Sequence, residues 1–96
     1  MKRYVLRPRA EADLADIWRY GVAQWSAKQA DTYYVTLTSA FLRLSEMPDL
    51  GRPYDDLRHG YFRYLVGSHA VFYRKVTAGI EIVRVLHQRM DFDRHL

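Results

Sequence analysis

Histidine and arginine are the residue types in this sequence most able to carry chemistry, because cysteine is absent. Histidine transfers protons near neutral pH, and arginine binds phosphates and carboxylates. His87 and Arg89, together with Arg63, could bind a phosphate. Catalysis at a phosphate needs more than such a site, namely a base for the attacking group and an acid for the leaving group. We therefore predict no catalytic residue.

The sequence also predicts no metal and no cofactor. The four histidines, His59, His69, His87 and His95, do not follow the spacing of metal ligands. Without cysteine, neither a disulfide nor a thiolate metal site can form. The glycine-rich phosphate loop and the nucleophile elbow are both missing from the sequence. Binding is therefore the expected class of function.

The composition predicts one globular domain over residues 1–96, with 49% apolar and 15% aromatic residues. The charged N-terminus does not resemble a secretory signal, and no apolar run approaches the roughly 20 residues that span a bilayer. We expect a cytoplasmic protein that makes no membrane contact. The net charge of +4 fits an acidic protein partner as well as a nucleic acid.

Two helices are expected in the first half of the chain. Residues 3–6 read as a short strand, and Pro8 allows a helix to begin directly after it. Ser26 and Gln29 form a capping box that predicts a second helix extending to Pro48, antiparallel to the first. The apolar positions recur at helical spacing. They are Leu14, Ile17, Trp18, Gly21, Val22 and Trp25, followed by Ala30, Tyr33, Tyr34, Leu37, Phe41 and Leu44.

The second half reads as a loop over residues 47–56 and three strands. The strands cover residues 61–66, 70–76 and 80–87, and the glycine-containing segments 67–69 and 77–79 are typical of hairpin turns. Strands joined by short turns are antiparallel. The expected fold is α+β, in the order β-α-α-β-β-β, with the N-terminal strand and the helical hairpin packed on a twisted antiparallel sheet.

This order, with these residues, resembles the RelE/ParE superfamily of toxins, and the ParE branch most closely. The resemblance covers nearly the whole chain, and its most specific parts are the Pro-x-x-Gly-Arg-Pro loop and the Leu-His-x-Arg ending. The matching segments are residues 4–10, 13–17 with Tyr20, 47–53, 57–58, 60–66, 71–73 and 83–91.

The resemblance implies the toxin of a type II toxin–antitoxin system, which in the ParE branch binds DNA gyrase. RelE relatives instead cut messenger RNA on the ribosome. This chain has Ala70 where cutting relatives carry an arginine, and no tyrosine follows Tyr73. We therefore expect a binding protein and not an enzyme, with a ribosome-dependent endoribonuclease as the alternative. A third possibility is an inert relative that binds only its antitoxin.

The resemblance and the exposed charges suggest two binding surfaces. The expected surface for the target is formed by Arg84, His87, Arg89, Met90 and Asp91. The expected surface for a ParD-like antitoxin, which carries a ribbon-helix-helix domain, comprises Trp18, Tyr20, Val35, Leu42, Arg58 and Arg63. An antitoxin helix would cover the apolar residues, and its carboxylates would pair with the arginines. DNA would be contacted only through the antitoxin. Ordinary solvated charges and scattered surface apolar residues are the other explanation for both groups.

Overall fold

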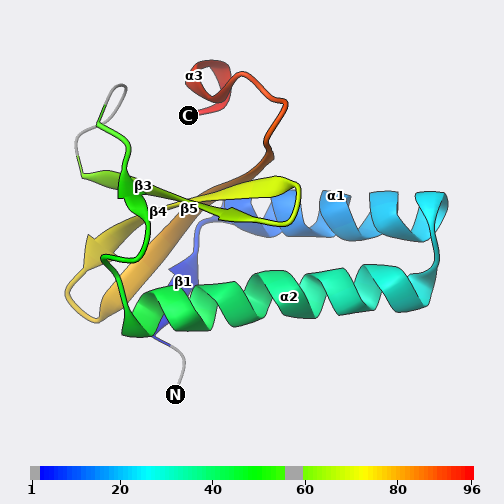
Figure 1. The fold of residues 1–96 in the computed structure, drawn as a ribbon, viewed down its shortest axis with the longest axis horizontal. Helices are drawn as coiled ribbons and strands as arrows, with labels where there is room; N and C mark the ends of the chain where they lie inside the picture. Colours follow the sequence, from blue (N-terminus) through cyan, green and yellow to red (C-terminus); the bar gives the residue numbers. More distant parts are fainter. Residues whose placement is uncertain (1–2, 56–59) are drawn as a thin grey trace.

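A helical hairpin lies against one face of a sheet (Figure 1). The structure is a computed structural model that describes residues 3–55 and 60–96. The described elements are β1 (Tyr4–Leu6), α1 (Pro8–Gln24), α2 (Ala27–Glu46), β2 (Arg52–Pro53), β3 (Tyr61–Val66), β4 (His69–Val76), β5 (Gly79–His87) and α3 (Phe92–His95). Within these residues the strand order is β1-β5-β4-β3-β2. The expected α+β fold, with its N-terminal strand and two long helices, is confirmed.

Local sequence explains where the long helices begin. Pro8 occupies the first turn of α1, where its missing N–H is not needed. The Ser26 hydroxyl accepts a hydrogen bond from the Gln29 backbone N–H at 3.1 Å, which confirms this half of the predicted capping box. None of the described helices is both long enough and apolar enough to cross a bilayer.

The apolar stripes of the two helices are only partly buried. Leu14 of α1 and Leu37 of α2 are buried as expected. Trp18 and Trp25, which the same spacing placed on the stripe, remain 38% and 62% exposed. Trp25 is exposed because the 17 residues of α1 span about 26 Å and carry it past the sheet, whereas Trp18 lies on the outer side of the hairpin. The distal half of the hairpin therefore extends beyond the sheet, as Figure 1 shows.

The sheet is mixed, which corrects the expectation of an antiparallel one. β3, β4 and β5 are antiparallel neighbours, as their short turns require. β1 instead pairs in parallel with β5, and Tyr4 lies opposite Ile80. No short turn connects these two strands, so local sequence could not fix their relative direction. β2 adds an antiparallel edge pairing inside the segment expected to be a loop.

An apolar cluster lies on each face of the sheet. The inner cluster packs between the sheet and the two long helices and includes Leu14, Leu37, Phe41 and Tyr73. The outer cluster is formed by Tyr61, Ala70, Phe72, Val83 and Leu86. Phe92 and Leu96 pack on this outer cluster. The C-terminal segment, in which no helix was expected, therefore covers the outer face through α3.

The Tyr73 hydroxyl holds the loop that precedes β2. It donates a hydrogen bond to the Pro48 carbonyl at 2.8 Å and accepts one from the Gly51 N–H at 2.9 Å. A Cβ at position 51 would lie only 2.4 Å from that hydroxyl oxygen. Glycine is therefore required at this position of the Pro-x-x-Gly-Arg-Pro loop for a structural reason.

Candidate functional site

Arg84 of β5, which was expected to bind a target, is committed to an internal ion pair. Its Nε and Nη2 atoms each lie 2.8 Å from an oxygen of Asp13, and both side chains are about seven-eighths buried, with 14% and 13% exposed. Its Nη1 atom donates to the His95 carbonyl at 2.8 Å. The hydrogen bonds to Asp13 raise the pKa of Arg84 against the opposing effect of burial. This arginine connects α1, β5 and the C-terminal segment, and we withdraw it from the candidate surface.

The four other residues expected to bind a target follow one another where β5 ends. His87 closes the strand, and its Nδ1 accepts a hydrogen bond from the Arg89 backbone N–H at 3.1 Å. Asp91 is the N-cap of α3, since its carboxylate accepts from the Asp93 N–H. The side chains of Arg89 and Met90 are exposed, and 43% of Met90 is accessible. Arg89 and Met90 thus expose their side chains to solvent.

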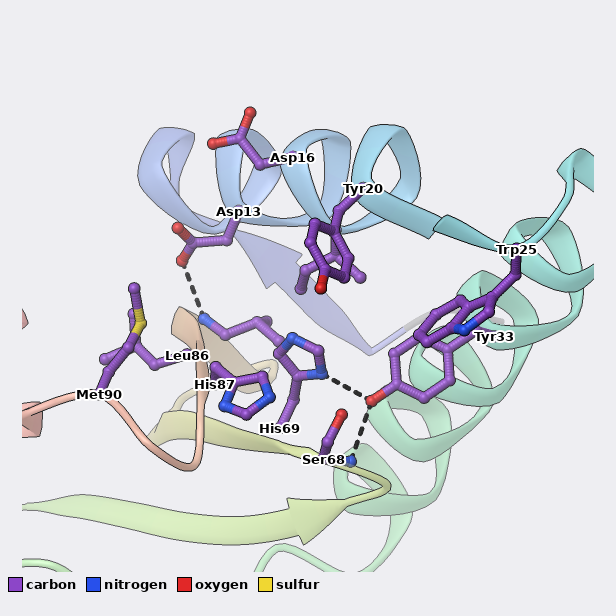
Figure 2. A pocket seen from close by; sticks show the side chains of 12 residues that line it. Asp13, Asp16, Tyr20, Trp25, Tyr33, Ser68, His69, Leu86, His87 and Met90 are labelled. Carbon is purple, nitrogen blue, oxygen red and sulfur yellow. Dashed lines mark hydrogen bonds between the residues drawn. The ribbon is translucent and has the colours of Figure 1, made fainter. Parts of the chain in front are cut away.

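A pocket of about 480 Å³ lies between the helical hairpin and the adjacent ends of β4 and β5. Tyr20 of α1 and Trp25, directly after that helix, line it on one side, and His87 and Met90 line it on the other, as Figure 2 shows. Tyr20 belongs to the expected antitoxin surface, whereas His87 and Met90 belong to the expected target surface. The structure therefore brings residues of both predicted surfaces to one pocket.

His69 also lines this pocket and was not predicted to have a role. It lies opposite His87 in the β4–β5 pairing, with 5.2 Å between the ring centroids. Its Nδ1 is 2.6 Å from the Tyr33 hydroxyl. Burial, and then the electrostatic effect of the neighbouring His87, lower the pKa of His69 to about 4, so its ring is neutral at neutral pH. Counting strand partners back from the β4–β5 turn would have paired His69 with Leu86, because an irregularity between Phe72 and Tyr73 shifts the register by one residue.

The outer side of the helical hairpin carries a shallow hollow of about 590 Å³. Trp18 and Val35 line it together, and the Trp18 indole N–H donates to Asp31 at 2.8 Å across the two helices. Val35 is 59% exposed. Of the other residues expected to meet an antitoxin, Tyr20 lines the separate pocket described above, and Leu42 is exposed farther along α2.

The arginines predicted from the sequence do not gather into a phosphate site in the described part of the chain. The Arg63 guanidinium lies 5.7 Å from the ring centroid of Tyr54, which packs on the outer cluster. His87 lines the pocket beside the helices, so Arg63 and His87 do not form the suggested phosphate site. Arg58 lies outside the described residues.

Comparisons with known proteins identify the family. The family described as "ParE toxin of type II toxin-antitoxin system, parDE" matches residues 4–92. The chain is 47% identical to Toxin ParE1 of Caulobacter vibrioides over 100% of this chain and 99% of that protein. It is 45% identical to Toxin ParE1 of Mycobacterium tuberculosis over 98% and 97% of the two chains.

Solved structures agree on the fold. The chromosomal ParDE system of P. aeruginosa superposes with a TM-score of 0.76 at 16% identity, covering 88% of this chain and 92% of that one. The toxin–antitoxin complex RelBE2 of Mycobacterium tuberculosis gives a TM-score of 0.62 at 23% identity, covering 88% and 95%. Together with the full-length sequence matches, these findings show that the chain belongs to the ParE family of type II toxins.

Proposed function

We propose that this toxin arrests growth by binding DNA gyrase, not by cutting RNA. The observation that carries the proposal is the pocket beside β5, which is rich in apolar side chains and is lined by Met90, the neighbour in sequence of the exposed Arg89. Exposed apolar surface next to an accessible arginine is typical of a protein-binding site. Family membership supports the choice of target, which would place the activity in the cytoplasm.

The same pocket is poorly suited to breaking a phosphodiester bond. His69, His87 and Tyr33 offer groups that can transfer protons, but none of the described lining residues is a lysine or an arginine. Phosphate chemistry needs cations to stabilise the charge that develops in the transition state. The ribosome-dependent endoribonuclease therefore remains the less favoured alternative.

A ParD-like antitoxin is the partner that we propose for the helical hairpin. Both solved relatives come from toxin–antitoxin systems. The hollow formed by Trp18, Val35 and their neighbours is apolar, exposed and lies across the two antiparallel helices, which suits an amphipathic helix of the antitoxin. Arg63 and Arg58 are proposed to meet antitoxin carboxylates. The ribbon-helix-helix part of the antitoxin would make the DNA contacts.

Expression in a bacterial host tests the proposed function. The toxin alone should arrest growth and produce chromosome breaks while transcripts stay whole, and co-expression of its antitoxin should restore growth. Cleaved transcripts with intact DNA would favour the endoribonuclease. Normal growth of cells that contain folded toxin would favour the inert relative.

Arg89→Ala and Met90→Ala test the surface better than a C-terminal truncation does. Removing everything after His87 would also remove Phe92 and Leu96, which cover the outer cluster. The two point variants leave α3 in place. We expect both to lose growth arrest and to keep antitoxin binding. Retained arrest in both variants would exclude this surface.

A further inference from the structure

The turn between β3 and β4 is attached to α2 through one tyrosine. The Tyr33 hydroxyl lies 2.6 Å from His69 Nδ1 and accepts a hydrogen bond from the Ser68 N–H at 3.2 Å, as Figure 2 shows. A Cβ at Gly67 would lie 2.7 Å from the same hydroxyl oxygen, so the turn packs directly on this tyrosine. The Val66 carbonyl is a more distant acceptor, at 3.3 Å. We assign the hydroxyl proton to the shorter contact, with neutral His69 as the acceptor.

The segment that carries the exposed Arg89 and Met90 is attached to this same turn. The Gln88 backbone N–H donates to the Ser68 carbonyl, and its side-chain amide donates to the Gly67 carbonyl, each at 2.9 Å. The His87 ring packs edge-on against His69. Residues 87–90 then form a tight turn in which the Met90 N–H donates to the His87 carbonyl at 2.9 Å.

These contacts form a continuous connection, which we call the Tyr33–His69 bridge and define as Tyr33, Ser68, His69 and Gln88. We propose that Tyr33 and His69 are positioning residues that hold segment 87–90 in the arrangement the target recognises. The inference rests on the proposed function of that segment. Side chains such as Arg89 and Met90 bind well only if their backbone is already fixed, because ordering it during association costs affinity.

Tyr33→Phe tests the bridge by removing one hydroxyl. Without it, the Ser68 N–H loses its acceptor and the turn that holds Gln88 loosens. Hydrogen exchange at the Gln88 amide should become about fivefold faster, since the bond to Ser68, one of the two hydrogen bonds that the hydroxyl makes, contributes roughly 1 kcal/mol. Amides of the central strand β4 should keep their exchange rates. Binding to purified gyrase should weaken about fivefold, and antitoxin binding should not change.

Tyr64→Phe is the matched control. Tyr64 is also half-buried and packs against the inner cluster, but its hydroxyl makes no hydrogen bond with the described residues. His69→Phe removes the Tyr33–His69 contact from the other side. The double variant with Tyr33→Phe should therefore bind gyrase no more weakly than either single variant. The proposed bridge would be contradicted if Tyr33→Phe and His69→Phe left the Gln88 exchange rate unchanged. It would also be contradicted if Tyr64→Phe weakened gyrase binding as much as they do.

The exchange measurement separates this inference from the proposed function. It reports how firmly segment 87–90 is held when no target is present. If Arg89→Ala and Met90→Ala both retain full growth arrest, the proposed target surface fails, and the positioning role for target binding fails with it. If Arg89→Ala loses arrest but Tyr33→Phe and His69→Phe arrest growth like the parent, only the positioning inference fails.

Discussion

Asp13 joins the first helix to the last strand through Arg84, which in turn binds the C-terminal segment. Besides its two contacts with Arg84, its carboxylate accepts a hydrogen bond from the Val85 N–H at 2.9 Å. Breaking a buried ion pair is costly because the remaining charge loses its partner without regaining water. The Asp13–Arg84 pair therefore has a larger structural role than exposed pairs such as Asp16–Arg19.

Asp13→Ala should lower the free energy of unfolding by about 3 kcal/mol. Urea denaturation of the purified protein would measure this change. Asp16→Ala is the matched control on the same helix, and because its ion pair is exposed the expected loss is below about 0.5 kcal/mol. Equal urea midpoints for the two variants would show that the Arg84 pair does not stabilise the fold.

The neutral state of His69 makes stability depend on pH. The pKa of His69 is lowered from 6.5 to about 4, mainly by burial. As the pH falls from 6.5 to 4, the unfolded chain therefore takes up a proton at this residue before the folded chain does. The free energy of unfolding should therefore decrease as the pH falls from 6.5 to 4. Below pH 4, His69 should cause no further decrease.

NMR titration of the His69 ring should give a midpoint near pH 4, well below the usual histidine value. His69→Phe should flatten the decrease of unfolding free energy between pH 6.5 and 4, because the titrating group is gone. A midpoint at 6.5, or an unchanged slope in the variant, would contradict the burial of the neutral ring.

At the scale of elements, α3 is a cover for the outer face of the sheet. Phe92 contacts Phe72 edge-on with 4.9 Å between ring centroids, and Tyr54 packs against both rings. Phe92→Ala should destabilise the protein by about 2 kcal/mol, because the ring is only partly buried. The exposed Arg94→Ala is the control in the same helix, and thermal unfolding compares the two. Equal melting temperatures would mean that α3 does not protect the sheet.

The helical hairpin carries the predicted antitoxin contact. Val35→Glu places a charge in the apolar hollow, so affinity for the antitoxin should fall about a hundredfold or more. The variant should still fold, since this position is already exposed to solvent. Thr36→Glu, one residue away on α2, is the control, and calorimetry or a pull-down with the antitoxin measures both. Equal affinities would exclude the hollow as the docking site.

The sequence correctly predicted the helix start and the turns that neighbouring residues determine. The Ser26 cap and the turns before His69 and Gly79 lie where the sequence indicated, within a residue. What could not be predicted depends on contacts between distant parts of the chain. The Tyr33–His69 contact joins residues 36 positions apart, and the Arg84–Asp13 pair joins residues 71 apart. Residue type alone made Arg84 look like a surface cation, although its partner was present in the first helix.

At the scale of the whole molecule, the proposed functions divide between two sides of the hairpin. The hollow with Trp18 and Val35 faces away from the pocket that contains His87 and Met90, while Tyr20 covers the pocket itself. A partner that reaches Tyr20 therefore also approaches the target surface. The proposed antitoxin would therefore obstruct the target surface only where it also covers Tyr20.

The most direct measurement adds the purified toxin to gyrase and supercoiled plasmid DNA, with a parallel reaction containing ribosomes and messenger RNA. We expect the plasmid to be linearised only when gyrase and toxin are both present, with Arg89→Ala much weaker and the messenger intact. Messenger cut on the ribosome, with no gyrase-dependent DNA breaks, would contradict a toxin that acts by binding gyrase.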